Sequence, residues 1–195
     1  MGPLRRSLER AGWPTWATTY PSHRATIGEL ADEVATRLRR DHPRGELVAV
    51  THSLGGILVR HLATAMPWRG LVMIAPPNRG SRLALAMRHL LPYRWAAGPA
   101  GQEIADGSSW PDPPQPFAVI AGVRGRSLRD PVSWISRGLG VLPADVPSDG
   151  TLAVEETQLP GMADFATVEA THNHILDHPL VHVWVRNFLE HGRLR

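Results

Sequence analysis

The sequence contains neither cysteine nor lysine, and it has only two tyrosines among its 195 residues. The absence of cysteine excludes disulfide bonds and metal sites built on thiolates. The 21 basic residues are all arginines, and the formal net charge is only +3. Because these arginines are scattered and form no basic stripe, we do not expect nucleic acid as a partner.

Long apolar runs are also absent. No run reaches the roughly 18 residues that a membrane-spanning helix requires, and Met1–Arg6 has no apolar signal core behind its arginines. We therefore expect a cytoplasmic protein with no stable membrane insertion. Hydrophobic residues make up 43% and charged residues 20% of the chain, which is ordinary for one globular domain spanning residues 1–195.

Short, unbroken apolar runs predict strands that are covered on both faces, as in a parallel sheet. The three strongest runs are Leu47–Val50, Leu71–Ile74 and Phe117–Ile120. Weaker strand patterns occupy residues 13–20, 151–155 and 165–169.

Helical patterns alternate with these strands. Thr26 and Glu29 form a capping-box pattern ahead of apolar residues at helical spacing, which predicts a helix that ends near Pro43. Ser81 is expected to cap a further helix, and Gly192 to end the last one. The remaining helical segments are predicted at 4–11, 57–66, 82–91 and 179–191. This alternation indicates an α/β fold, namely a three-layer α/β/α sandwich with a mostly parallel sheet.

Residues 92–116 lack a periodic pattern and are rich in proline, glycine and serine. One interpretation is a cap inserted above the reactive edge of the sheet, with Trp95, Trp110 and Ile104 lining an acyl-binding pocket. The alternative is a surface loop whose tryptophans pack on the core. A second loop, rich in glycine and serine, is expected from the end of the strand at 117–120 to residue 147.

Thr51-His52-Ser53-Leu54-Gly55 joins a predicted strand to a predicted helix. The pattern resembles the G-x-S-x-G nucleophile elbow, with threonine at the first glycine. A serine in this strained turn needs small neighbours, a need that Gly55 and Gly56 meet and Thr51 meets less well. The turn raises the hydroxyl above the sheet edge and directs the Leu54 N–H at the position of an oxyanion. The alternative is an ordinary turn in which Ser53 caps the helix.

A serine nucleophile needs a histidine to accept its proton and a carboxylate to orient that histidine, in the chain order Ser, Asp or Glu, His. His172 and His174 fall in the loop between the last predicted strand and the last helix, where the base is expected. His182 and His191 are expected to face solvent. His52 adjoins the serine, but a neighbour at a strand end points away from it, so we interpret His52 as structural.

Asp149 lies between Pro147-Ser148 and Gly150, just outside a predicted strand. The glycine allows a tight approach, so we interpret Asp149 as the acid of the triad. Asp145 is its main rival, and the alternative is that Asp149 only caps a turn.

These motifs resemble those of bacterial α/β-hydrolases related to triacylglycerol lipases and to inositol deacylases. The likeness rests on Val48–Arg60 around the elbow, Pro77–Ser81 after the next strand, Ser148–Thr151 as the acid loop and Ala170–Asn173 as the histidine loop. It implies the α/β-hydrolase fold, Ser53 as the nucleophile, Asp149 as the acid and His172, rather than His174, as the base. None of these motifs identifies a substrate.

Members of this family begin with a buried strand that ends in His-Gly, followed by a loop that donates a second oxyanion N–H. This chain opens at Met1-Gly2-Pro3, in what resembles the helix after that loop. Loss of one oxyanion donor costs on the order of 10²–10³ in rate. We therefore expect impaired activity and interpret the true start as lying upstream, with a fragment or a degenerate relative as alternatives.

The sequence thus predicts a serine hydrolase that cleaves a carboxylic ester, small or lipid-like, through an acyl-serine intermediate. No cofactor is expected and no metal, because His172 and His174 are too few for a zinc site. Two other interpretations stay open: acyl transfer or amide cleavage by the same triad, and a non-catalytic relative that binds a ligand or partner. Acyl chain length and oligomeric state are not predicted.

Overall fold

A computed structural model of the chain describes residues 1–126 and 131–195. Within them a parallel sheet has the strand order β1-β2-β3-β4. The strands are β1 (Leu47–His52), β2 (Trp68–Ile74), β3 (Phe117–Gly122) and β4 (Asp164–Val168). All of β3 and the last five residues of β2 are buried. The strands predicted from the unbroken apolar runs are confirmed, because such runs are stable only where both faces are covered.

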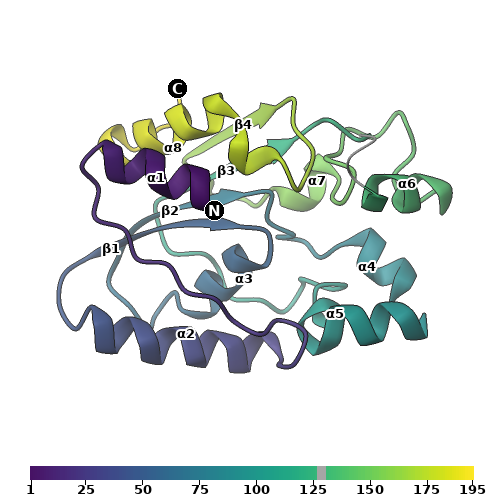
Figure 1. The fold of residues 1–195 in the computed structure, drawn as a ribbon, viewed down its shortest axis with the longest axis horizontal. Helices are drawn as coiled ribbons and strands as arrows, with labels where there is room; N and C mark the ends of the chain where they lie inside the picture. Colours follow the sequence, from purple (N-terminus) through teal and green to yellow (C-terminus); the bar gives the residue numbers. More distant parts are fainter. Residues whose placement is uncertain (127–130) are drawn as a thin grey trace.

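Helices cover both faces of this sheet (Figure 1). In chain order they are α1 (Gly2–Arg10), α2 (Ile27–Asp41), α3 (Leu54–His61), α4 (Arg82–Met87), α5 (Leu91–Glu103), α6 (Pro131–Gly138), α7 (Val154–Thr157), the 3-10 turn η1 (Ile175–Asp177) and α8 (Pro179–His191). Helices α1 and α8 enclose one apolar cluster against the sheet, and α2 and α3 form a second cluster on the opposite face. The predicted three-layer α/β/α sandwich is therefore confirmed.

Local signals set the ends of two helices as predicted. The Thr26 hydroxyl accepts a hydrogen bond from the Glu29 N–H, and the Glu29 carboxylate accepts one from the Thr26 N–H, which completes the capping box of α2. Gly192 adopts φ 74° directly after α8, a left-handed conformation that glycine enters without a Cβ penalty. Ser81 caps α4, although α4 ends at Met87 rather than at residue 91.

The strand predicted at residues 13–20 is wrong: this segment is extended but pairs with no strand of the described residues. Its Trp13 packs on the α1–α8 cluster, whereas Trp16 and Tyr20 pack on the α2–α3 cluster. The segment therefore passes from one face of the sheet to the other, beside the edge strand β1 (Figure 1). Its apolar residues contribute to two separate clusters. Their spacing in the sequence therefore resembles that of a strand although the segment is not one.

The strand predicted at residues 151–155 is also wrong. The region forms one isolated bridge, between Ser148 and Ala153, and then turns into the short helix α7. Buried Glu156 explains the turn, because its carboxylate accepts hydrogen bonds from the N–H groups of Ala153 and Arg82, both at 2.5 Å. Burial raises the pKa of this carboxyl group. The loop expected after β3 contains α6, and residues 127–130 of that loop lie outside the described residues.

Residues 92–116 begin with a helix instead of an irregular loop. Helix α5 is broken at Gly98, which has φ 64°. A Cβ at this position would lie 2.1 Å from the carbonyl oxygen of His23. The second half of α5 is joined to the start of α2, because Ala100 N–H donates to the Ala25 carbonyl and the Glu103 carboxylate accepts from the Ile27 N–H. These long-range contacts leave no periodic signal in the sequence.

We predict that Gly98→Ala destabilises the fold by about 2–4 kcal/mol, because the added Cβ meets backbone atoms and the positive φ disfavours alanine. Gly28→Ala is the matched control: no atom lies within 4 Å of its added Cβ, and the site is helical. It should stabilise by roughly 0.4–1 kcal/mol. Urea unfolding of both variants checks the prediction, and equal midpoints would contradict it.

Candidate active site

Ser53 stands at the junction of β1 and α3, where the chain reverses sharply. Its backbone has φ 52° and ψ −127°, a conformation that is rare for a residue with a Cβ. Two backbone hydrogen bonds hold it, from Ser53 N–H to the Ile74 carbonyl at 2.9 Å and from Gly56 N–H to the Ser53 carbonyl at 3.0 Å. Such local strain is typical of a nucleophile elbow, and no side-chain hydrogen bond caps the helix here.

Small residues around Ser53 let α3 pack closely on the sheet. A Cβ at Gly56 would lie 2.6 Å from the Met73 side chain and 3.3 Å from Pro76. Of the two glycines after Ser53, Gly56 is therefore the one whose neighbours leave no room for a side chain. Thr51 replaces the first glycine of the pattern without a clash, since its Cβ lies 3.6 Å from the position that a Gly55 Cβ would occupy. The Thr51 hydroxyl is buried and donates to the Val72 carbonyl at 3.3 Å.

His172 connects Ser53 to Asp149. Its Nε2 lies 3.0 Å from the Ser53 Oγ, and its Nδ1 lies 2.7 Å from Asp149 Oδ2. A carboxylate can only accept, so Nδ1 carries the proton and Nε2 is left to accept one from the serine hydroxyl. The backbone is joined as well, because His172 N–H donates to the Asp149 carbonyl at 3.0 Å.

Asp149 is buried, and both of its carboxylate oxygens accept hydrogen bonds. It is only 1% exposed, and its Oδ1 accepts hydrogen bonds from the N–H groups of Thr151 at 2.9 Å and Leu152 at 2.7 Å. The end of β3 makes room for this loop with a glycine, because a Cβ at Gly122 would lie 2.8 Å from the Asp149 Cβ. The carboxylate thus faces the imidazole in a fixed orientation.

The rival residues lie elsewhere. His174 is exposed, and its Nδ1 lies 3.0 Å from the Thr171 hydroxyl. Asp145 is exposed too. His191 faces solvent as expected, but His182 does not, since it is half-buried with its Nε2 2.7 Å from the Leu176 carbonyl oxygen.

His52 lies closer to the site than its place in the sequence predicts. It was expected to point away from the site, yet its Nε2 lies 3.0 Å from the His172 carbonyl oxygen, and the two rings are 4.8 Å apart. A carbonyl only accepts, so His52 donates this bond through Nε2–H. Burial and then the charge of a protonated His172 lower the pKa of His52 to about 4. The side chain is therefore neutral above that pH. The strand bends into the elbow at this point, so simple alternation of side chains fails.

Leu54 is the first residue of α3, and its N–H therefore has no acceptor within the helix. The positive end of the helix dipole lies at the same place, which favours negative charge there. This position follows Ser53 directly, as the elbow pattern requires.

The two tryptophans predicted to line an acyl pocket have different surroundings. Trp95 is 88% exposed on the first half of α5. Trp110 packs on the α2–α3 cluster, with the guanidinium of Arg60 5.6 Å from its ring centroid and bonded to its carbonyl at 3.1 Å. Ile104 packs on the same cluster. The break of α5 at Gly98 explains the outcome, because it separates the exposed half of the segment from the packed half.

Residues 1–126 and 131–195 hold no group of three or more His, Asp or Glu side chains placed to bind a metal ion. None of the helices in these ranges is both long and apolar enough to cross a bilayer.

Comparison with known proteins gives matches in structure. No protein-family model matches the chain, and no curated protein matches its sequence. The chain is similar to the mature form of a lipase from Bacillus licheniformis, with a TM-score of 0.75 and 15% identity over 96% of this chain and 82% of the lipase. A metagenomic carboxyl esterase has a TM-score of 0.62 and 18% identity, over 87% of this chain and 57% of the esterase.

A third similar structure, phospholipase PlaB from Legionella pneumophila, has a TM-score of 0.52 and 18% identity, over 80% of this chain and 40% of the phospholipase. At such low identities the likeness establishes the fold. The chain has the α/β-hydrolase fold, and the expected resemblance is confirmed at that level.

The depressed pKa of His52 predicts how stability depends on pH. Its pKa is about 4 in the folded chain and near 6.5 when unfolded, so the unfolded state binds more protons between these values. Stability is then lost as the pH falls from 6.5 toward 4, by up to about 1.4 kcal/mol per pH unit from this group. His52→Gln keeps an N–H donor but does not titrate, so its stability should fall less steeply.

Urea unfolding of wild type and His52→Gln across this pH range measures the difference. His191→Gln serves as the control, because it removes an exposed imidazole at the end of α8. Parallel stability curves for wild type and His52→Gln would show that His52 does not titrate as inferred.

Proposed function

We propose that the chain is a serine hydrolase that cleaves carboxylic esters through an acyl-serine intermediate. The observation that carries this proposal is the continuous hydrogen-bonded path from Asp149 through His172 to Ser53. The α/β-hydrolase fold adds support, because lipases and esterases are among the structures similar to this chain.

In the proposed reaction Ser53 Oγ attacks the ester carbonyl carbon while its proton passes to His172 Nε2. The carbonyl oxygen becomes an oxyanion, which the Leu54 N–H stabilises together with the dipole of α3. Protonated His172 then gives its proton to the leaving alcohol as the acyl-serine forms. Water, deprotonated by His172, attacks the acyl carbon and releases the acid and Ser53.

Asp149 keeps His172 in the tautomer that this sequence requires and stabilises the imidazolium that forms. His52 acts as a positioning residue through its bond to the His172 carbonyl. Because its pKa is lowered to about 4, it places no positive charge beside the base near neutral pH. The Leu54 N–H is the oxyanion donor that we assign.

A lipid-like ester is the substrate class that the surface favours. Seven of the ten large apolar side chains that are exposed in the described residues lie on or beside α4, α5 and α6, which lie together at one end of the molecule (Figure 1). They are Leu85, Leu90, Leu91, Trp95, Trp134, Ile135 and Leu139. These helices follow the carboxyl ends of β2 and β3, the same sheet edge at which Ser53 follows β1. An exposed apolar surface of this kind is typical of a binding surface.

The triad assignment predicts the outcome of active-site labelling. A fluorophosphonate probe should label the wild-type chain and not Ser53→Ala. Asp149→Asn should lower kcat on a soluble ester by roughly 10⁴, because it holds His172 in the wrong tautomer. His172→Ala removes the base and should lower kcat further, by a factor on the order of 10⁶. An added alcohol or amine acceptor, followed by product analysis, separates hydrolysis from acyl transfer.

The matched controls are the rival residues, His174→Ala and Asp145→Asn, which should stay within about twofold of wild type because both are exposed and outside the path. If the folded protein is not labelled, or if Ser53→Ala is labelled equally, the chain is not a serine hydrolase of this kind. An equal loss in His174→Ala would reassign the base.

The substrate class predicts a second, separate result. The double variant Leu91→Ser, Trp95→Ser removes two exposed apolar side chains of α5. Its rate on an emulsified long-chain ester should fall roughly tenfold or more, since even one such side chain contributes on the order of 1.5–3 kcal/mol when it is fully buried, and about 1.4 kcal/mol corresponds to tenfold. Its rate on a soluble acetate ester should not change.

The control is Leu180→Ser, Val183→Ser, which removes exposed apolar side chains from α8. An equal loss on both esters, or an equal loss in the control, would contradict docking of the substrate through α5.

A further inference from the structure

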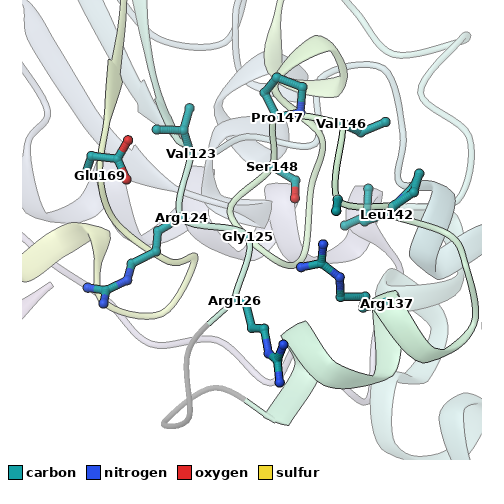
Figure 2. A pocket seen from close by; sticks show the side chains of 12 residues that line it. Val123, Arg124, Gly125, Arg126, Arg137, Leu142, Val146, Pro147, Ser148 and Glu169 are labelled. Atoms are coloured by element: carbon teal, nitrogen blue, oxygen red, sulfur yellow. The ribbon is translucent and has the colours of Figure 1, made fainter.

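A hollow of about 330 Å³ lies beside the acid loop (Figure 2). It is bounded by the segment after β3, by Arg137 of α6, and by the chain from residue 142 to Ser148. The three residues of the proposed triad do not line it. The hollow is therefore a feature separate from the site at Ser53.

Two guanidinium groups approach the hollow from different elements. Arg126 comes from the segment after β3, and its guanidinium rests 4.1 Å from the ring centroid of Trp134. Arg137 projects from α6 toward Ser148 (Figure 2). Neither takes part in an ion pair within the described residues. Arg124 and Glu169 lie on the other side of the hollow in this view.

Ser148 supplies a neutral donor to the same hollow, on the side of Arg137 (Figure 2). The residue is only 4% exposed, and its hydroxyl is directed into the hollow (Figure 2). Gly125 makes room for it, because a Cβ there would lie 2.9 Å from the Ser148 Oγ. A hydroxyl that faces the hollow can donate a hydrogen bond to an anion bound there.

We propose that this hollow binds the phosphate group of a small molecule. Guanidinium groups match phosphate oxygens with paired, charge-assisted hydrogen bonds, and the Ser148 hydroxyl adds a neutral donor. Among the described residues that line the hollow there are three arginines and one carboxylate, so an anion is favoured there. The volume is at the lower end of small-molecule sites and exceeds what one phosphate group fills, which selects a small phosphate ester or a diphosphate.

Isothermal titration calorimetry of the full chain with inorganic pyrophosphate tests this proposal, at an ionic strength held constant with sodium chloride. We expect saturable binding with one site per chain. Arg137→Gln, Arg126→Gln and Ser148→Ala should each weaken it roughly tenfold or more, because each removes a hydrogen bond to a charged ligand. Arg137→Lys keeps the charge but loses the paired geometry, so it should bind between wild type and Arg137→Gln.

Arg39→Gln is the matched control, because Arg39 is an exposed arginine in the last turn of α2. It should bind pyrophosphate like wild type. Absence of saturable binding would overturn the proposal, and so would an equal loss in Arg39→Gln and Arg137→Gln, which would indicate attraction by overall charge. Inorganic phosphate, titrated in parallel, should bind more weakly than pyrophosphate if the hollow takes more than one phosphate group.

Two checks keep the result independent of the proposed hydrolase. Ser53→Ala should bind pyrophosphate like wild type, since Ser53 does not line the hollow. Circular dichroism of Ser148→Ala shows whether the acid loop variant is folded, and if it is not, Arg126→Gln and Arg137→Gln decide the question.

Discussion

The paired contact between Asp149 and His172 is the interaction on which the candidate site depends. One hydrogen bond joins the carboxylate to the ring, and another joins the two backbones. Together they connect the loop that follows β3 to the loop that follows β4, two segments that are far apart in the chain. Gly122 permits this contact, because any larger residue at the end of β3 would collide with the Asp149 side chain. The imidazole reaches the Ser53 hydroxyl only because both loops are fixed in this way.

Much of the sandwich could be predicted from the sequence because its signals are local. Unbroken apolar runs marked the buried strands, Thr26 and Glu29 marked the start of α2, and Gly192 marked the end of α8. What failed depended on distant partners. The start of α5 is exposed and its end is fixed by Ala25 and Ile27, so neither half shows a regular apolar face. The helix α7 exists because a buried carboxylate binds two N–H groups, one of them 74 residues away.

The candidate site was predictable to a similar extent. Ser53, Asp149 and His172 each follow a strand, and the carboxyl ends of parallel strands meet at one edge of a sheet. His52 was misplaced because the elbow rotates the chain at that point, which strand alternation does not describe. The different surroundings of the two tryptophans could not be predicted, because they depend on how α5 breaks at Gly98. Proximity along the chain was therefore a poor guide wherever the backbone leaves a regular element.

Thr51 has a consequence for how such elbows are recognised. The Thr51 side chain fits beside Gly55, because the position that has no room for a side chain is Gly56. The threonine hydroxyl donates a hydrogen bond to the Val72 carbonyl. What the turn demands is space between strand and helix, and that space can be provided by a different residue from the one a consensus names. A pattern search that insists on glycine two positions ahead of the serine would pass over this chain, whereas a search for room around the turn would find it.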